Sequence, residues 1–358
     1  MNDEMTAVIL AGGEGTRLRP LTSTRPKPLL PVLGRPCLEY VIRALVDANV
    51  RTAYLTCGYR SQDMVDALGS GRQFGIDLRF AFEDRPAGTA GAVKLLESKL
   101  SGTIVVVSGD VLADVDIRSL VEYHHRKGAL ATMALTTVEK PEEFGIVGLD
   151  DDGRIARFKE KPRTEEVFSN LINAGIYVLE ARVLEDVPPG EKFDFSKQLF
   201  PKLLERSERL YGMPLTGLWK DIGRPRDLLE ANIRMAARKG SEIDVEGART
   251  CGPIVATRFR AYGCRIEGPA YVGEGASIGR GADLSGCAVG DRVDVGEDTT
   301  IADSMLMDGC TVGKGSSLSG CVIGKECCIG DDVHLTNVLM GDRVHLDGPV
   351  EIRDRTLE

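Results

Sequence analysis

A 17-residue repeat near the end of the chain places the strongest constraint on its fold. Apolar residues return there after steps of six, six and five positions. The repeated positions are Val289, Val295, Ile301, Leu306, Val312, Leu318, Ile323, Ile329, Leu335, Met340, Leu346 and Ile352. A fixed period of this kind means that successive coils stack on one another and share one continuous hydrophobic core.

The hexads, in which glycine often follows the apolar residue as at Ile323-Gly324, resemble the repeats of the left-handed parallel β-helix. In that fold three short strands form one triangular coil, and the apolar residues point inward. We expect this fold over residues 263–358. The pattern lapses over residues 236–262, which are expected to be a linker, and residues 1–235 are expected to form a separate domain.

The first domain alternates short apolar runs, such as 77–82 and 103–108, with helical patterns. This alternation is typical of an α/β domain with a mainly parallel sheet. Glu83 and Asp110 follow two of the runs, and a glycine-rich stretch follows the first run of the chain. Ligands of open α/β sheets bind at the carboxyl ends of the strands. We therefore expect these residues to face one pocket.

The glycine-rich stretch from Leu10 to Pro36 reads LAGGEGTRLRPLTSTRPKPLLPVLGRP. Its glycines allow sharp turns and bring backbone N–H groups close to a ligand, and successive N–H groups form an anion-binding concavity. Arg17 and Lys27 add positive charge to the same stretch. The stretch has neither the Walker spacing nor G-x-G-x-x-G. Its chemistry predicts a polyphosphate ligand.

The complete string is more specific than a glycine cluster. GGxGTRLxPLT followed by PKPxxP resembles the signature of the sugar-nucleotide pyrophosphorylases, which join a sugar-1-phosphate to a nucleoside triphosphate. Other segments are similar to this family in the same order, namely GD at 109–110, EFGIV at 143–147, FKEKP at 158–162, NAGIY at 173–177 and WKDIG at 219–223. The resemblance implies a Rossmann-like nucleotidyltransferase domain.

The resemblance also implies a nucleotide half of the site. The glycines would offer their backbone to the nucleotide, Arg17 would stabilise the β- and γ-phosphates and the departing pyrophosphate, and Lys27 would hold the α-phosphate. The implied nucleotide-binding residues are Leu10, Ala11, Gly12, Gly13, Gly15, Thr16, Arg17, Lys27, Glu83, Pro86, Gly88 and Asp110.

A sugar half is implied by the later segments. Gly145 would back onto the sugar, Glu160 and Asn173 would hydrogen-bond its hydroxyl groups, and Lys161 would neutralise its phosphate. The catalytic residues that the resemblance implies are Arg17, Lys27, Asp110, Lys161 and Asp221.

The implied reaction is attack by the sugar-phosphate oxygen on the α-phosphorus, with release of pyrophosphate. A phosphate monoester has its second pKa near 6, so the nucleophile is largely dianionic at neutral pH and needs no general base. The reaction needs charge neutralisation and in-line positioning. Asp110 and Asp221 would hold a Mg²⁺ cofactor, which usually binds through one or two carboxylates plus phosphate oxygens.

Glu83 indicates which nucleotide is used. Family members that use TTP or UTP commonly have Gln at this position. An ionised glutamate only accepts hydrogen bonds, and guanine offers two adjacent donors, whereas thymine and uracil offer one donor flanked by acceptors. The segments at 88–91 and 168–179 also look like the mannose-1-phosphate guanylyltransferases, although Ala87 and Ser108-Gly109 depart from them. We expect GTP and mannose-1-phosphate; the alternative is glucose-1-phosphate with TTP or UTP.

The sequence admits two other interpretations. Non-catalytic regulatory subunits exist in the broader family, but they usually lose a metal aspartate or a phosphate-binding cation, and this chain keeps all five charged site residues. The β-helix could alternatively carry an acetyltransferase activity with His334 or His345 as base. Lone histidines on a coil surface are more often solvated, so the default role of the β-helix is an assembly platform. We therefore expect a homo-oligomer.

Composition argues against several classes of protein. A net charge of −9 argues against a general nucleic-acid binder. The chain has no apolar stretch of the length that spans a membrane, and its acidic start lacks the regions of a signal peptide. The nine cysteines lack zinc-site spacing, and Cys287 and Cys321 share one place in the repeat. Buried free thiols in a reducing cytoplasm are expected.

Overall fold

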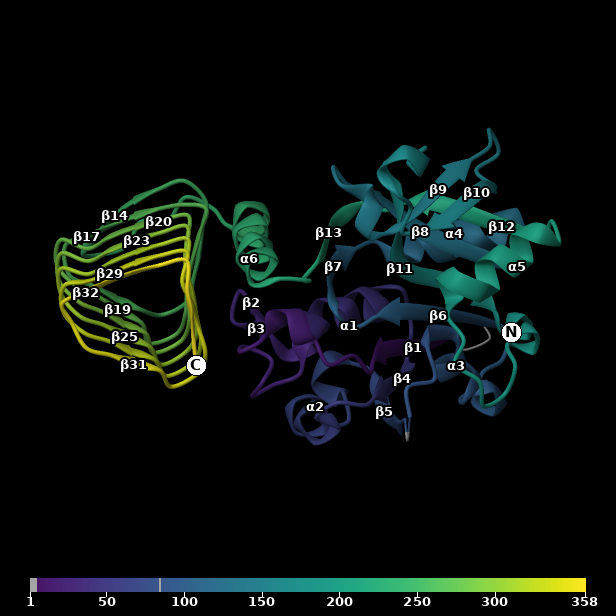
Figure 1. Cartoon of the computed structure of the whole chain (residues 1–358), viewed down its shortest axis with the longest axis horizontal. Coiled ribbons are helices and arrows are strands. Elements are labelled where there is room, and N and C mark those ends of the chain that lie inside the picture. Colours follow the sequence, from purple (N-terminus) through teal and green to yellow (C-terminus); the bar gives the residue numbers. More distant parts are fainter. Residues whose placement is uncertain (1–4, 84) are drawn as a thin grey trace. The chain divides into compact units, whose positions relative to one another are not determined.

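The structure, a computed structural model, describes residues 5–83 and 85–358 (Figure 1). Contacts divide the chain into two compact units. The described residues of the first are 5–14, 38–83 and 85–219, and the second comprises residues 15–37 and 220–358. The glycine-rich stretch is thus divided after Glu14, and most of it belongs with the C-terminal coils. This grouping differs from the predicted boundary at 235, because residues 15–37 make their contacts with residues far along the chain.

The first unit is built on a nine-stranded sheet. One side of the sheet is a run of parallel strands, in the order β6 (Thr103–Ser108), β1 (Thr6–Ala11), β4 (Thr52–Cys57) and β5 (Asp77–Phe82), with β5 at the edge. The other strands are β8 (Ala131–Thr137), β9 (Gly145–Leu149), β10 (Ile155–Glu160), β11 (Leu171–Glu180) and β12 (Leu210–Pro214), of which β11 runs antiparallel to β6. The predicted strands at 77–82 and 103–108 are confirmed, as is the α/β class.

Helices cover both faces of this sheet. They are α1 (Cys37–Asp47), α2 (Ser61–Leu68), α3 (Thr89–Lys94), α4 (Ile117–Lys127) and α5 (Phe200–Glu205). Residues of α3 and α5 share one apolar cluster with Met133 of β8. Thr132 is adjacent to Met133 on β8, so its side chain points to the opposite face of the sheet, where it contacts His124 of α4. β7 (Val111–Val115), which follows β6, pairs with β13 (Gly217–Asp221) in a two-stranded ribbon. α6 (Pro225–Lys239) follows β13.

A buried histidine joins α4 to the sheet. His124 is 1% exposed, its Nδ1 lies 2.9 Å from the Thr132 hydroxyl, and its Nε2 lies 3.2 Å from Glu180. Burial lowers the pKa of the His124 ring, although Glu180 opposes the shift. Because the unfolded chain then binds a proton more readily at this residue, its contribution to stability is present above about pH 6.5 and is lost as the pH falls below that value.

We expect His124→Gln to flatten the pH dependence of stability on the acid side of neutrality. The free energy of unfolding of the wild type should fall as the pH is lowered from about 7.5 to about 5.5, with a contribution from His124 no steeper than about 1.4 kcal/mol per pH unit, the limit for one proton. Urea unfolding at several pH values measures this slope. His125→Gln, which changes the exposed neighbour, is the control, and equal slopes in wild type and His124→Gln would contradict the account.

The second unit contains three parallel sheets of short strands. The first sheet consists of β14 (Ala248–Cys251), β17 (Cys264–Glu267), β20 (Asp283–Ser285), β23 (Thr300–Ala302), β26 (Ser317–Ser319), β29 (Val333–Thr336) and β32 (Val350–Arg353). The second consists of β15 (Ile254–Ala256), β18 (Ala270–Val272), β21 (Ala288–Val289), β24 (Met305–Leu306), β27 (Val322–Ile323), β30 (Leu339–Met340) and β33 (Thr356–Leu357). The third consists of β16 (Arg260–Ala261), β19 (Ser277–Ile278), β22 (Asp294–Val295), β25 (Thr311–Val312), β28 (Cys328–Ile329) and β31 (His345–Leu346).

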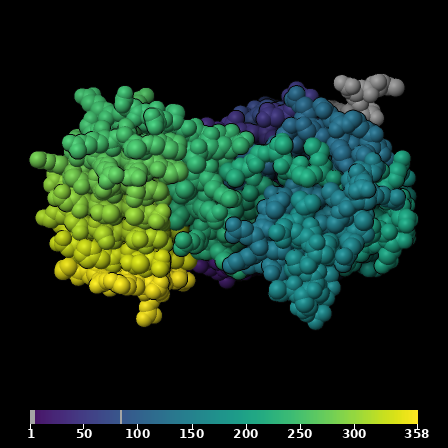
Figure 2. Space-filling view, turned by 90° about the horizontal axis from the view of Figure 1, so that it is seen from above, coloured from purple at the N-terminus to yellow at the C-terminus, as the bar shows by residue number. Residues whose placement is uncertain are grey.

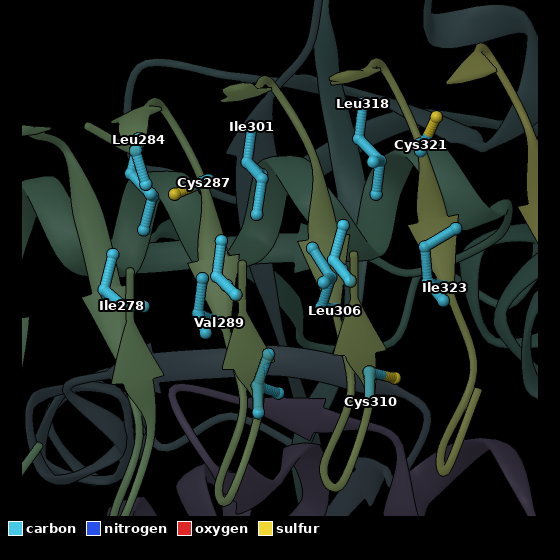
Figure 3. Close-up of a cluster of buried hydrophobic side chains, with 14 of the residues drawn as sticks. Ile278, Leu284, Cys287, Val289, Ile301, Leu306, Cys310, Leu318, Cys321 and Ile323 are labelled. Carbon is cyan, nitrogen blue, oxygen red and sulfur yellow. The ribbon is translucent and has the colours of Figure 1, made fainter. Parts of the chain in front are cut away.

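The strand register confirms the 17-residue period, and the three parallel sheets are consistent with the predicted left-handed β-helix. Leu284 pairs with Ile301, which pairs with Leu318, which pairs with Leu335. Figure 2 shows the coils stacked in sequence order, from green to yellow. Figure 3 shows Val289, Leu306 and Ile323 in a row on successive strands, inside the apolar core.

The β-helix begins earlier than residue 263. Its first strand starts at Ala248, inside the segment 236–262 that the sequence predicted as a linker. Ala248 pairs with Cys264, a step of 16, and Arg265 pairs with Asp283, a step of 18. These irregular steps hide the first coil from a search for a constant period.

The cysteines behave as structural residues. All nine lie in the described part of the chain, none is in a disulfide, and seven are buried. Among residues 5–83 and 85–358, no cluster of His, Cys, Asp and Glu is suited to hold a metal ion without further ligands. The described residues also include no helix long and apolar enough to cross a membrane.

Candidate active site

Three predicted nucleotide-binding residues lie at the carboxyl ends of the parallel strands. Gly12 follows β1, Glu83 follows β5, and Asp110 follows β6. A Cβ atom on Gly12 would lie only 3.0 Å from the Glu83 Oε1, so glycine leaves room for that carboxylate beside the backbone of the loop. The expected grouping of Gly12 with Glu83 is therefore present in the first unit. Leu10 and Ala11 are the last two residues of β1.

Glu83, which we expect to select the nucleotide base, is held at the start of the loop between β5 and α3. Its Oε2 accepts a hydrogen bond from the Ala87 amide at 3.2 Å. A cavity of about 450 Å³ beside the loop is lined by residues that include Glu83, Pro86 and Thr56. The Thr56 hydroxyl is the one buried side-chain polar atom of the described residues that has no hydrogen-bond partner. Sequence reasoning did not single out Thr56, because a threonine in a strand is ordinarily structural.

The far side of the same loop is closed by a second segment. The amides of Ala90 and Gly91 both donate to the Phe193 carbonyl at 2.9 Å, and the Thr89 amide donates to Asp194 at 3.0 Å. Gly88 has a φ of +76°, and a Cβ there would lie 2.7 Å from the Phe193 carbonyl oxygen. Gly88 therefore has a structural reason to be glycine, in addition to its predicted place in the nucleotide site.

The predicted sugar-binding residues Gly145 and Glu160 are neighbours across the β9–β10 pair. A Cβ on Gly145 would lie 2.7 Å from the Glu160 Oε2, so Gly145 makes space for that carboxylate. Burial raises the pKa of Glu160, and Lys161 opposes the shift. Lys161 itself is exposed, with φ of +43°, and its amide donates to the Phe144 carbonyl at 2.9 Å.

Asn173 is fixed by residues that sequence reasoning missed. Its Nδ2 donates to the hydroxyls of Tyr177 at 2.9 Å and Ser196 at 3.1 Å, and its Oδ1 accepts from the Gly175 amide. An amide oxygen has two lone pairs, so Oδ1 can still accept from a sugar hydroxyl. Burial raises the pKa of Tyr177 to about 12, so the phenol stays protonated. The signal for Tyr177 was its place in the NAGIY segment.

The segment around Asn173 lies near the end of β6. A Cβ on Gly175 would lie 2.6 Å from the Ser108 hydroxyl, and Ile176 pairs with Val107. Because β11 runs antiparallel to β6, the residues before Ile176 extend past the carboxyl end of β6, where Asp110 follows. The Trp219 indole donates to the Ala174 carbonyl at 2.8 Å, which adds a second missed support.

In the second unit, the loop that carries the predicted phosphate-binding cations folds back on itself. Gly15 has a φ of +63°, and a Cβ there would lie 3.0 Å from the Cβ of Lys27. The buried Thr22 hydroxyl donates to the Gly15 carbonyl at 2.9 Å. Gly15 is followed by η1 (Thr16–Leu18), which carries Arg17. Gly12 and Gly13 do not have positive φ, so only Gly15 of the three makes the left-handed turn.

Lys27 and Asp221 form a partly buried ion pair. The Lys27 Nζ lies 3.4 Å from the Asp221 Oδ1, with side-chain exposures of 8% and 26%. A Cβ on Gly223 would lie 3.0 Å from the Asp221 Oδ2 and 3.4 Å from an Arg17 nitrogen. Arg17, Lys27 and Asp221 therefore lie together, although they are far apart in the sequence.

The carboxylates fit the chemistry of a magnesium site. The described residues hold no cluster of three or more metal-binding side chains. Mg²⁺ is ordinarily held by one or two carboxylates plus substrate phosphates, and Asp110 and Asp221 are donors of that kind. Each lies at a strand end, in the first and the second unit respectively.

Comparisons with known proteins identify the family of the chain. The family described as Nucleotidyl transferase matches residues 6–238, and the GMPPB C-terminal domain matches residues 266–357. The chain is 40% identical to a mannose-1-phosphate guanylyltransferase catalytic subunit beta from Drosophila pseudoobscura pseudoobscura, over 73% of this chain and 71% of that protein. It is 32% identical to a UTP–glucose-1-phosphate uridylyltransferase from Synechocystis, over 79% of this chain and 77% of that protein.

A solved structure from Bacillus anthracis is also similar. It is described as a glucose-1-phosphate thymidylyltransferase in complex with a sucrose, and it matches with a TM-score of 0.59 and 30% identity. The match covers 64% of this chain and 94% of that one. The family match spans more than half of the sequence and includes every predicted site residue. The chain belongs to the nucleotidyl transferase family.

Proposed function

We propose that this nucleotidyltransferase transfers GMP from GTP to mannose-1-phosphate, forming GDP-mannose and pyrophosphate. The observation that carries the choice of base is Glu83, held at the carboxyl end of β5 against the loop backbone at Gly12. A carboxylate at that position accepts from the two adjacent donors of guanine. A relative named as a mannose-1-phosphate guanylyltransferase supports the choice of sugar.

The charged residues divide the phosphate chemistry among them. Lys161 neutralises the phosphate of the sugar, Lys27 binds at the α-phosphate, and Arg17 binds the β- and γ-phosphates that leave as pyrophosphate. Glu160 and Asn173 orient the sugar hydroxyls. The sugar phosphate is already dianionic at neutral pH, so these residues catalyse by positioning and by stabilising charge.

We propose that Asp110 and Asp221 would hold Mg²⁺. The bound ion would supply additional charge neutralisation between the two phosphate groups. Lys27, whose Nζ lies 3.4 Å from the Asp221 Oδ1, orients that carboxylate.

Replacing Glu83 with Gln should weaken the preference for guanine. A glutamine presents a donor as well as an acceptor, so the ratio of kcat/KM for GTP to that for UTP should fall about 10- to 100-fold, the effect of losing one charged hydrogen bond. Steady-state kinetics with both nucleotides measures this ratio. Glu122→Gln, on the exposed surface of α4, is the matched control. An unchanged ratio in Glu83→Gln would remove Glu83 as the selecting residue.

The reaction itself is tested by its stoichiometry. With GTP, mannose-1-phosphate and Mg²⁺, the protein should release one pyrophosphate for each GDP-mannose formed. Absence of product with every sugar-1-phosphate and nucleoside triphosphate would overturn the proposed function.

A second candidate is glucose-1-phosphate with UTP or TTP, which the names of the Synechocystis and Bacillus relatives favour. A sugar acetyltransferase activity of the β-helix stays a weaker hypothesis. His345 is exposed, and its Nε2 lies 3.0 Å from the Asp347 Oδ1. The Nδ1 of His334 lies 3.3 Å from the Ser317 hydroxyl. We also propose a cytoplasmic location and a homo-oligomer, the former because all nine cysteines are free thiols.

A further inference from the structure

The last complete coil of the β-helix contacts the loop that carries Lys27. Asp342 follows β30, and its side chain is only 6% exposed. Its Oδ2 accepts a hydrogen bond from the Thr24 hydroxyl at 2.6 Å and forms an ion pair with Arg25. Arg25 is 12% exposed, and its other terminal nitrogen lies 3.3 Å from the sulfur of Met307. The two charges are therefore paired and largely removed from water.

The two oxygens of Asp342 have separate partners. Its Oδ1 accepts from the Lys325 amide at 2.8 Å, which lies one coil earlier. Other aspartates of the β-helix do the same, since Asp331 accepts from the Lys314 amide at 2.9 Å and Asp291 from the Glu274 amide at 2.8 Å. The Oδ1 of Asp342 thus stabilises the stacking of the coils. The Oδ2 binds Thr24 and Arg25 of the loop.

The loop is held on both sides of Lys27. Upstream, Arg25 and Thr24 are bound by Asp342. Downstream, the Leu33 amide donates to the Asn232 Oδ1 at 2.8 Å, and the Asn232 Nδ2 donates to the Pro31 carbonyl at 3.1 Å. Asn232 belongs to α6 and is 1% exposed.

Between these anchors the loop has little freedom. Pro26 precedes η2 (Lys27–Leu29), and Pro28 lies within it. A Cβ on Gly341, the residue before Asp342, would lie 3.2 Å from Pro20, so the coil and the loop are in contact there also. The position of the Lys27 ammonium group is therefore coupled to the end of the β-helix.

We propose that Asp342 is a positioning residue for the nucleotidyl transfer, acting through Arg25 to hold Lys27 where it meets the α-phosphate. The inference rests on the proposed function of Lys27. It makes the β-helix a working part of the active site rather than an assembly platform alone. A displacement of a catalytic group by about 1 Å can cost about 100-fold in rate, so a distant carboxylate can have a large effect.

The test compares Asp342→Asn with Asp331→Asn in the full-length protein. Both substitutions keep an oxygen that can accept from the amide one coil earlier, but only the first removes the charge that pairs with Arg25. Asp342→Asn should lower kcat about 10- to 100-fold, with the KM for the sugar phosphate changed less than twofold. Asp331→Asn should keep wild-type kinetics. Thermal unfolding of both variants reports any damage to the coils.

Arg25→Met supplies an independent arm if Asp342→Asn does not fold. It should lower kcat to a similar extent, and the double variant should be no slower than the slower single variant, because both act through one contact. Equal kinetics of Asp342→Asn, Arg25→Met and the wild type would overturn the inference while leaving the proposed function intact. An inactive wild type would instead overturn the proposed function.

Discussion

Replacing Asp110 with asparagine should lower kcat by at least about 10³-fold, because it removes a carboxylate that we assign to the metal and to the charge of the transferring phosphate. The substitution is nearly isosteric, so the end of β6 should keep its conformation. Pyrophosphate release at saturating substrates measures the loss. The same assay over a range of Mg²⁺ concentrations should show that the residual activity needs far more of the ion.

A suitable control lies six residues further along the chain. Asp116 caps α4, and its side chain accepts from the Ser119 amide at 3.0 Å. Asparagine caps helices about as well as aspartate, so Asp116→Asn should change neither stability nor activity appreciably. A loss of only a few fold in Asp110→Asn, with an unchanged dependence on Mg²⁺, would refute the assignment of Asp110 to the metal.

Replacing Lys27 with methionine should lower kcat/KM for the nucleotide about 10²- to 10³-fold, the effect of removing a preorganised charge from the transition state. Methionine preserves most of the apolar length of the buried side chain. It also leaves Asp221 without its 3.4 Å partner, so the variant tests the pair as well as the cation. Steady-state kinetics in which GTP is varied at saturating sugar phosphate measures the change.

Lys127→Met is the matched control for the loss of a lysine–aspartate pair. Lys127, the last residue of α4, pairs with Asp152 in the turn between β9 and β10, outside the proposed site. It should keep wild-type kinetics. Similar losses in the two variants would mean that the effect of Lys27→Met is a general consequence of changed charge, and would contradict its assignment to the α-phosphate.

Local patterns predicted the two fold classes because each pattern reports its own structure. The apolar runs at 77–82 and 103–108 became β5 and β6 with the expected bounds. The repeat positions Ile301, Leu318 and Leu335 became one row of the β-helix core. Such periods depend only on which residues face inward, and that information is written in the sequence.

The start of the β-helix was not predictable in the same way. A constant period of 17 fails at the first two pairs of strands, where the pairing steps are 16 between β14 and β17 and 18 between β17 and β20. The hydrogen bonds between coils tolerate one residue more or less in a turn, whereas a search for a period does not. The contacts of residues 15–37 with α6 and the coils were also invisible, since pairs such as Arg25 and Asp342 are separated by 317 positions.

In the site, too, residues within matched motifs could be predicted, whereas the residues that position them could not. The resemblance named Asn173, Glu160 and Asp221, because these lie in short strings that can be matched to a family. It did not name Ser196, which lies in none of these strings and whose hydroxyl accepts a hydrogen bond from the Asn173 Nδ2 at 3.1 Å. Supporting residues are defined by distances in the folded chain, and no local string marks them as belonging to a site.

The most direct test of the central claim is a matrix of nucleoside triphosphates against sugar-1-phosphates, with pyrophosphate release as the readout. GTP, UTP, TTP and ATP would each be combined with mannose-1-phosphate and glucose-1-phosphate in the presence of Mg²⁺. The account predicts the highest kcat/KM for GTP with mannose-1-phosphate. A higher value for UTP or TTP with glucose-1-phosphate would contradict it.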